Sequence, residues 1–401
     1  MTATTAILVA ALPFPSYRND TVDPKPSAST EETGQPSQFT IVSSGDILLH
    51  LSVNEFARVG QTYDYTTLFE PISPWIEQAD LALCSLEVPI VPPGEEPSNY
   101  PALGSPPEIA DSLKAMGWDG CALATNHTMD RGFDGVESTI DNFERVGLGH
   151  HGTARTEDES RAIQYYTVES GGQQVVVAHL SASTLTNGMA HPSGKQWSWN
   201  VVGPQGHREV DDLIADAKRA RDGGADLVVV SMHWGTEYVT EPTEEQTEIG
   251  QQLDESGVVD LVFGNHSHVA EPVTKLDGGP GGDGMWVVWS MGNTISGQTV
   301  DGQGYGVLTG LVTTATVDVS PSGDARVSNL EWTAITQDVG TYRLFELSKL
   351  MDGQVPRGTS LTPAAIQGRA DAIYPTMTAD GSSERTSPPS SGGRLVEQER
   401  R

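Results

Sequence analysis

The stretch that decides the fold reads DLVFGNHSH and runs from Asp260 to His268. Its apolar half has the length and composition of a short buried strand, and Gly264 marks the end of that strand. Two histidines, His266 and His268, then alternate along the chain. In extended backbone they would point to the same side, where both could reach one metal ion or a close pair of ions. The alternative is that both are solvent-exposed loop histidines. Only the residues at the other strand ends can distinguish these two interpretations.

Four further apolar runs end in residues that bind metals. The runs cover residues 39–44, 81–86, 119–124 and 227–232, and the residues at or just after their ends are Asp46, Glu87, Asn126, His127 and His233. Strand ends of an open α/β sheet converge on one crevice, so these side chains are expected to meet. Carboxylates, an amide oxygen and imidazoles together suit Mn²⁺, Zn²⁺ or Fe²⁺. Glu87 is the candidate bridge between two ions and Asp46 a terminal ligand, while His50 is a weaker candidate.

The segments between these strands carry the apolar spacing of helices. That spacing occurs within residues 109–116, 134–143, 210–217 and 242–257, so a layered βα fold is predicted. After His268 the pattern changes to strands and turns over residues 285–291, 305–319 and 325–336, which predicts a second sheet built from hairpins. Residues 181–203 lack clear periodicity. They are either a substrate-covering lid or a plain surface insertion.

Composition excludes some classes of partner. The chain of 401 residues has 54 acidic and 23 basic residues, a formal charge of -31. Such a charge repels nucleic acid and anionic membrane surfaces, so no nucleic-acid partner is expected. Cys84 and Cys121 each lie in a predicted buried strand. We therefore expect two core thiols rather than a disulfide, which leaves the redox compartment open.

Both ends of the chain have the composition of disordered segments. Residues 1–38 and 376–401 are rich in Pro, Ser, Thr, Gly and charged residues, and they flank a predicted domain over residues 39–375. The apolar run at residues 6–12 lacks a basic flank and is too short to span a bilayer. A tether before a domain is typical of exported proteins, so we expect an extracytoplasmic protein, attached to the cell surface or secreted. A cytoplasmic protein with a disordered start is the alternative.

Six sequence blocks occur in a fixed order. They are Gly45-Asp46, Ser85-Leu86-Glu87, ATNHTMDRG from Ala124 to Gly132, HWGTEY from His233 to Tyr238, GNHSH from Gly264 to His268, and SMGN from Ser290 to Asn293. Together they resemble the CapA family of poly-γ-glutamate capsule biosynthesis proteins, a branch of the calcineurin-like metallophosphatase superfamily. The resemblance covers about residues 39–335. The Asp-x-His opening of the superfamily is absent, because Ile47 and Leu48 follow Asp46.

The resemblance implies a four-layered α/β/β/α metallophosphatase-like sandwich with a dinuclear metal site. The ligands it implies are Asp46, Glu87, Asn126, His233, His266 and His268. His127 would be the acid beside the site. Asp130 could orient an imidazole and Arg131 could meet a substrate carboxylate, although both could simply open the next helix. Trp234 is either an aromatic wall or core, and Asn293 is expected to stabilise a turn rather than to bind metal.

We therefore expect a metal-dependent enzyme, a hydrolase or transferase acting on γ-glutamyl amide bonds of poly-γ-glutamate or a related envelope polymer. Two divalent ions, Mn, Zn or Fe, would activate water while His127 protonates the leaving group. Its partners would be an anionic polymer or peptide-like substrate and the membrane-bound machinery that synthesises the polymer. A polyanion would need a local cationic patch from the ions and from Arg131, Arg155 or Lys195. The alternatives are a phosphoesterase, a peptide-modifying enzyme such as an epimerase, and a non-catalytic polymer-binding or assembly subunit.

Overall fold

The computed structural model describes residues 1–3, 35–377 and 382–401 of the chain. The chain divides into two units, Met1–Glu32 and Thr33–Arg401, and the fold and the site lie in the second. Most of the predicted linker, residues 1–38, lies outside the described residues. Ser37 and Gln38 already belong to the first strand, β1 (Ser37–Leu48), so the folded domain begins before residue 39.

The first sheet is centred on β1, whose side chains alternate between two apolar cores. Phe39 and Ile41 enter one core, and Val42 enters the other. β1 pairs in parallel with β4 and β13 and antiparallel with β14. The order is β16-β15-β14-β1-β4-β5-β6, with β13 also on β1 and β17 on β15. The other strands are β4 Leu81–Leu86, β5 Gly120–Ala122, β6 Gly149–His151, β13 Asn293–Ser296, β14 Thr309–Val319, β15 Ala325–Gln337, β16 Leu344–Glu346 and β17 Ser383–Glu384.

The second sheet has the strand order β11-β12-β10-β9-β8-β7-β18. Its strands are β7 Gln164–Ser170, β8 Gln173–Ser183, β9 Leu227–His233, β10 Leu261–Asn265, β11 Val273–Leu276, β12 Met285–Val288 and β18 Gly393–Arg400, while β2 Arg58–Val59 and β3 Thr62–Tyr63 form a separate hairpin.

The prediction of a second sheet built from hairpins after His268 is therefore wrong. The hairpin β14–β15 joins β1 in the first sheet, because β14 alternates between the same two cores, with Leu311 in one and Val312 in the other.

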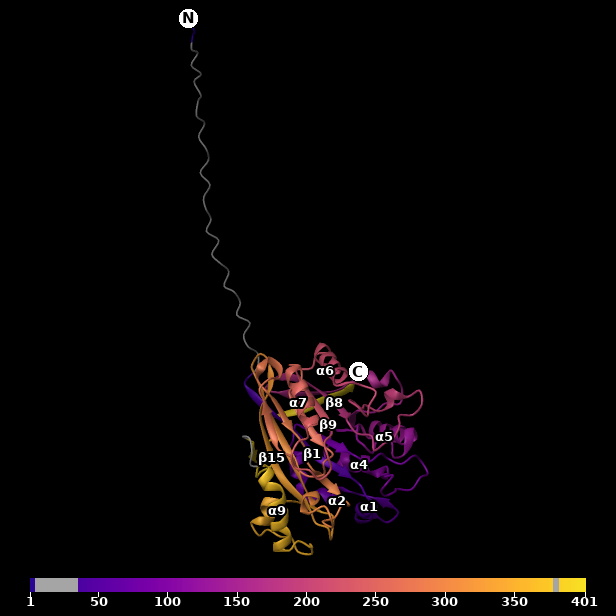
Figure 1. Ribbon diagram of the computed structural model, residues 1–401. Helices are drawn as coiled ribbons and strands as arrows, with labels where there is room; N and C mark the ends of the chain where they lie inside the picture. The colour runs from indigo at the N-terminus through magenta and orange to yellow at the C-terminus, as the bar shows by residue number, and fades with distance from the viewer. Residues whose placement is uncertain (4–34, 378–381) are drawn as a thin grey trace. The chain divides into compact units, whose positions relative to one another are not determined.

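Apolar clusters between the two sheets and on their outer sides hold four layers together. The facing sides of the two sheets form the central core, which includes Ile41 of the first sheet and Val229 and Phe263 of the second. Helices α1–α5 cover the outer side of the first sheet, and α6 and α7 cover that of the second. The predicted α/β/β/α sandwich is confirmed. The helices are α1 Leu51–Ala57, α2 Thr66–Phe69, α3 Ser73–Glu77, α4 Glu108–Ala115, α5 Gly132–Val146, α6 Val210–Asp222, α7 Glu244–Glu255, α8 Leu347–Met351 and α9 Pro363–Met377. Figure 1 shows α9, in yellow, beside β15.

Two of the predicted helices have a capped end. The Thr243 side chain accepts the backbone N–H of Gln246 and starts α7, and Gly147, in left-handed backbone at φ 71°, ends α5. Among the described residues, none of these helices has the length and apolar content needed to span a membrane.

The prediction of a disordered tail over residues 376–401 is wrong for the described part of that segment. α9 continues to Met377, and β18 pairs antiparallel with β7 from Gly393 to Arg400. The Asp80 carboxylate accepts the backbone N–H groups of Gly392 at 3.2 Å and Gly393 at 2.9 Å. A polar edge strand is held mainly through its backbone, so its composition resembles that of a disordered segment.

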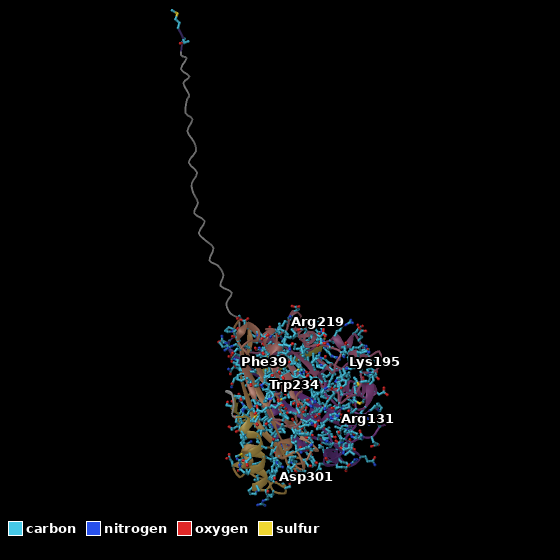
Figure 2. The ribbon with its side chains drawn as sticks, viewed as in Figure 1. Phe39, Arg131, Lys195, Arg219, Trp234 and Asp301 are labelled. Atoms are coloured by element: carbon cyan, nitrogen blue, oxygen red, sulfur yellow. A yellow bond between two sulfur atoms is a disulfide. The ribbon has the colours of Figure 1, made fainter. Side chains whose placement is uncertain are left out.

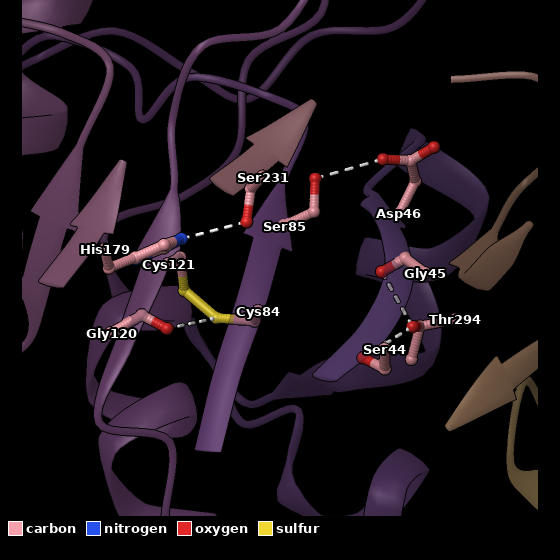
Figure 3. Close-up of a disulfide and its surroundings, with 10 residues drawn as sticks. All are labelled: Ser44, Gly45, Asp46, Cys84, Ser85, Gly120, Cys121, His179, Ser231 and Thr294. Carbon is pink, nitrogen blue, oxygen red and sulfur yellow. Dashed lines mark hydrogen bonds between the residues drawn. A yellow bond between two sulfur atoms is a disulfide. The ribbon is translucent and has the colours of Figure 1, made fainter. Parts of the chain in front are cut away.

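The prediction of two free thiols is also wrong. Cys84 and Cys121 form a disulfide between β4 and β5, where they are register partners with Cα atoms 4.3 Å apart (Figure 3). Two cysteines in separate apolar runs give no sign of their register, because that depends on how the two strands pair. The cross-link joins the strand before Glu87 to the strand before Asn126.

Candidate metal centre

The predicted ligand residues meet where carboxyl ends of strands from both sheets come together. In the first sheet, Asp46 lies within β1 near its carboxyl end and Glu87 directly follows β4, and in the second sheet His233 ends β9. A carboxylate oxygen of Asp46 lies 3.7 Å from His233 Nδ1, and one of Glu87 lies 3.8 Å from His233 Nε2. The sequence pattern indicated one sheet with one crevice. The site instead lies where two sheets meet, because the two parallel strand sets end on the same side of the sandwich.

Glu87 is the clearest sign that this site is built for a cation. Its side chain is 1% exposed, and neither carboxylate oxygen accepts a hydrogen bond from any residue that the structure describes. A buried carboxylate without donors costs several kcal/mol unless a cation or a proton neutralises it. Glu87 therefore has the coordination capacity that a metal ion would use.

Two overlapping groups of ligand atoms share Glu87. Glu87, His233 and His266 form one group, and Asp46, Glu87 and His268 form the other, with all atoms of a group within 4.8 Å of one another. All five side chains are buried. Oxygen and imidazole donors in this mixture fit Mn²⁺, Zn²⁺ or Fe²⁺, and Glu87 is common to both groups.

Asp46 is fixed by its neighbours on both oxygens. Oδ1 accepts Ser85 Oγ at 3.1 Å, and Oδ2 accepts the backbone N–H of His266 at 2.9 Å (Figure 3 shows the Ser85 contact). The preceding Gly45 lies against the backbone carbonyl of Gly292, where a Cβ atom would collide. Glycine is thus required at residue 45 for β1 to bring Asp46 into the site.

His266 and His268 do not lie in extended backbone, contrary to the assumption made from their alternation. Their φ angles are 100° and 60°, in the left-handed region that costs a non-glycine residue about 1–3 kcal/mol. The bond from His266 N to Asp46, and one from Tyr238 N to Ser267 O at 2.7 Å, hold this turn. The turn sends the two imidazoles to different ligand groups.

Asn293 holds the ring of His268. Asn293 Oδ1 lies 3.1 Å from His268 Nδ1, and Asn293 Nδ2 donates to Gln298 Oε1 and Val307 O. Because the amide nitrogen is occupied, its oxygen faces the ring and Nδ1 carries the hydrogen. Nε2 then carries no hydrogen and is the atom that could bind a metal ion, 4.0 Å from Glu87 Oε1. This role was missed from the sequence, although Asn293 lies in a recognised block.

Asn126 lies next to His233, with Oδ1 at 2.9 Å from His233 Nε2. Its Nδ2 donates to Asn187 Oδ1 at 3.2 Å, which orients the amide oxygen toward the imidazole. Asn187 belongs to the segment of residues 181–203 that lacked periodicity. That segment therefore contacts the centre through Asn126. Its first three residues belong to β8.

His127 lies at the edge of the centre and is oriented by Asp130. Nδ1 lies 2.6 Å from Asp130 Oδ2, and Nε2 lies 4.0 Å from Glu87 Oε1. A carboxylate only accepts hydrogen bonds, so Nδ1 donates to it and Nε2 faces the centre. The side chain of His127 is 7% exposed.

Two of the three side chains of the predicted cationic patch are paired with carboxylates. Arg131 pairs with Glu95, and Arg155 pairs with Asp141, Glu144 and Glu159. Lys195 lies over the ring of Phe133 at 3.6 Å. Figure 2 labels Arg131, Lys195 and Trp234.

Two other candidates have structural contacts. Trp234 is core: it is buried and donates to Trp289 O at 2.8 Å. His50 accepts the backbone N–H of Gly297 at 3.1 Å.

Burial dominates the electrostatics of the centre. It raises the pKa of Asp46 to about 7, and burial followed by the charge of Asp46 raises that of Glu87 well above its usual range. Burial lowers the pKa of His266 to about 3 and those of His233 and His268 well below their usual range. The imidazoles are thus neutral, and a bound cation would favour the ionised form of the two carboxyl groups beside them.

Residues 40–298 match a family model, "Bacterial capsule synthesis protein PGA_cap". The chain belongs to this family. It is 26% identical over 271 residues to the capsule biosynthesis protein CapA of Bacillus anthracis, covering 65% of this chain and 60% of that protein. It is 26% identical over 265 residues to the PGA biosynthesis protein CapA of Bacillus subtilis (strain 168), covering 63% and 62%. The chain thus spans about 60% of the length of these relatives. The predicted CapA relationship is confirmed, and all six sequence blocks lie within the matched residues.

Two solved structures are similar over most of this PGA_cap chain. NAD nucleotidase (NadN) of Haemophilus influenzae superposes with a TM-score of 0.40 at 11% identity, covering 86% of this chain and 57% of that one. The calcineurin-like phosphoesterase YfkN of Bacillus subtilis superposes with a TM-score of 0.41 at 11% identity, covering 84% and 96%.

Proposed function

We propose that this PGA_cap protein is a metal-dependent hydrolase or transferase acting on γ-glutamyl amide bonds of a capsule or envelope polymer. The observation that carries the proposal is Glu87, a buried carboxylate without hydrogen-bond donors that belongs to both ligand groups. The names of the relatives, which concern capsule and PGA biosynthesis, support the choice of polymer.

The chain would hold two divalent ions through Asp46, Glu87, Asn126, His233, His266 and His268. When bound, such ions supply an activated water and Lewis-acid stabilisation of developing negative charge. Glu87 and Asp46 would neutralise part of the charge of these ions, and Asn293 would keep His268 in the tautomer whose Nε2 can bind a metal. Burial of these side chains excludes bulk water, which strengthens every electrostatic interaction in the centre.

His127 would move the proton. Asp130 accepts from Nδ1, so a proton on Nε2 points toward the centre, where the amine leaving group of a cleaved amide needs one. An amine is a poor leaving group without protonation, so an amide substrate depends on this histidine. His127 would touch the reacting atoms, whereas Asp130 acts through it as a positioning residue.

The recognition of a polyanion would depend on the ions rather than on side-chain cations. Arg131 and Arg155 are already paired with carboxylates in a chain of formal charge -31. An extracytoplasmic location and membrane-bound synthesis machinery as partner remain part of the proposal. The Cys84–Cys121 disulfide supports that location, because disulfides persist in oxidising compartments.

The test is elemental analysis of the purified full chain together with a hydrolysis screen. The substrates are poly-γ-glutamate and the phosphodiester bis-p-nitrophenyl phosphate. We expect bound Mn, Zn or Fe and shortening of poly-γ-glutamate that stops with a chelator and returns with the metal. Cleavage of the phosphodiester alone would favour a phosphoesterase. Bound metal without turnover of either substrate would favour a polymer-binding or assembly subunit.

A further inference from the structure

A hollow with a volume of about 320 Å³ lies next to the candidate centre and includes none of its predicted ligands. One wall is the end of β6 and the residues after it, from His151 to Ala154. Another wall comes from the segment that lacked periodicity and consists of Trp197, Trp199 and Asn200. Thr153 lines this hollow and also a small cavity that Glu87 lines. The volume is at the lower end of the roughly 300–1,000 Å³ of small-molecule sites, so it suits a small ligand rather than a long polymer segment.

Hydrogen-bond donors without acceptors occur on these walls. His151 Nδ1 accepts the backbone N–H of Ser181 at 2.8 Å, and burial lowers the pKa of His151 well below its usual range. The ring is therefore neutral and carries its hydrogen on Nε2. Thr153 Oγ1 and Trp199 Nε1 are buried, and neither forms a hydrogen bond with any residue that the structure describes. Because an unpaired buried donor is costly, these groups favour an acceptor from outside the chain.

Arg400 adds a further donor to the hollow. Its Nη2 donates to Thr153 O at 3.2 Å, and its Nη1 donates to Glu159 Oε1 at 2.9 Å. Its Nε atom is buried and has no acceptor among the described residues. Thr153 also pairs with Trp199 through an isolated antiparallel bridge. The unpaired donors of Arg400, Thr153 and Trp199 therefore belong to residues in direct contact.

The lining of the hollow has more arginines than carboxylates. Its charged residues are Arg161, Arg208, Arg219, Arg400, Glu157, Asp212 and Asp216. Four arginines against three carboxylates leave one positive charge, in a chain whose formal charge is -31. Asp216 is already held by Arg208 at 2.7 Å and by Arg219 at 2.8 Å. An oxyanion accepts hydrogen bonds and carries negative charge, so it matches both the donors and the charge of this lining.

We infer that this hollow is a second binding site, which takes a small ligand through an oxyanion, a carboxylate or a phosphate group. The oxygens of that group accept from Thr153, Trp199 and Arg400. The choice between the two sources rests on the proposed function, under which the ligand is a glutamyl unit, such as a chain end or a released product, held by its carboxylate. This contact lies apart from the ions, which the proposed function alone does not supply.

The test measures ligand binding to metal-free full chain by calorimetry, after the chelator has been dialysed away. The probes are γ-glutamylglutamate, inorganic phosphate and the neutral diamide glutaramide. We expect the dipeptide to bind and glutaramide not to bind. Because no metal ion is present, binding does not depend on the chemistry of the centre.

Two variants remove one unpaired donor each. Thr153→Val and Trp199→Phe should each weaken dipeptide binding roughly 10-fold or more, the usual effect of losing a hydrogen bond to a charged group. Thr153→Ser keeps the hydroxyl and should bind as the wild type does. Thr314→Val and Trp118→Phe are the matched controls, because these residues are also buried, have no hydrogen-bond partner for Oγ1 or Nε1 among the described residues, and do not line the hollow. In thermal melting, Thr153→Val should lose no stability and Trp199→Phe no more than Trp118→Phe.

Binding of phosphate but not of the dipeptide, with the same pattern among the variants, would keep the oxyanion site and overturn the glutamyl source. Equal binding of glutaramide, no binding of either anion, or binding unchanged in both Thr153→Val and Trp199→Phe would overturn the site itself. A chain that binds the dipeptide in this way but hydrolyses nothing would defeat the proposed function alone. A chain that hydrolyses the polymer but binds neither anion when metal-free would defeat this inference alone.

Discussion

Asp130 Oδ2 lies 2.6 Å from His127 Nδ1 and also accepts the backbone N–H of Leu103 at 2.7 Å. The second contact fixes the carboxylate, and the carboxylate fixes the imidazole. His127 Nε2 is therefore kept 4.0 Å from Glu87 Oε1 without being a member of either ligand group. A residue that donates a proton beside a metal centre must not itself bind the metal, because its nitrogen has to carry the proton.

Replacing His127 with Gln should lower turnover of an amide substrate roughly 10²- to 10⁴-fold, the usual contribution of a general acid. Metal content, measured by elemental analysis, should persist. A substrate with a good leaving group should lose less, since it needs little protonation on departure. Loss of metal in the variant would make His127 a ligand, and normal turnover of both substrates would make it structural.

Replacing Glu87 with Gln should remove metal from both positions, because this carboxylate is the one residue common to the two groups. We expect metal content well below one ion per chain and a lower melting temperature in the presence of metal, since the bound ions stabilise the native state. Glu346→Gln is the control, because Glu346 is also buried but pairs with Lys349. Full metal content in Glu87→Gln would contradict the shared-ligand arrangement.

Metal affinity should rise with pH. Burial raises the pKa of Asp46 to about 7 and that of Glu87 well above its usual range, so both carboxyl groups hold protons that a metal must displace. His266, whose pKa is lowered to about 3, is already neutral and adds no dependence near neutrality. Affinity should strengthen as pH increases through about 7, with proton release visible by calorimetry in buffers of different ionisation enthalpy. A metal affinity independent of pH over that range would contradict the raised pKa values of these carboxyl groups.

Removing residues 393–401 should destabilise the domain. β18 covers the edge of β7, and its loss exposes that edge together with the contacts of Asp80. We expect a loss of at least ~2 kcal/mol in the free energy of unfolding, on the order of two net hydrogen bonds, measured by urea titration. Val396→Thr, at an exposed position on the same strand, should stay within about 0.5 kcal/mol of the wild type. If the truncated chain has the same free energy of unfolding as the wild type, β18 covers the edge of β7 without stabilising the domain.

Disulfide loss should also lower stability. The Cys84–Cys121 bond spans a sequence separation of 37 residues, for which loop-closure entropy predicts about 4 kcal/mol of stabilisation. The double variant Cys84→Ala with Cys121→Ala should unfold at lower urea, and denatured wild-type protein should show no free thiol. Two titratable thiols in freshly purified protein would mean that the pair is reduced.

Helix positions, strand ends and ligand types could be predicted from local patterns. Residues such as Leu213 and Ala217 recur at helical spacing, and each predicted ligand follows an apolar run, because burial of one face leaves a periodic trace in the chain. The six predicted ligand residues do lie together. Recognition of the family depended on the same short blocks.

By itself the sequence determined which residues would lie at strand ends and which chemistry they could support. Tertiary structure alone decided that two sheets supply them, that Cys84 meets Cys121, and that the polar β18 completes a sheet. It alone decided that His266 and His268 turn apart in left-handed backbone and that Asn293 orients His268. The physical reason is that periodicity reports how a residue is buried, whereas strand partners, register and side-chain hydrogen bonds join residues far apart in sequence and are set only when the sheets pack.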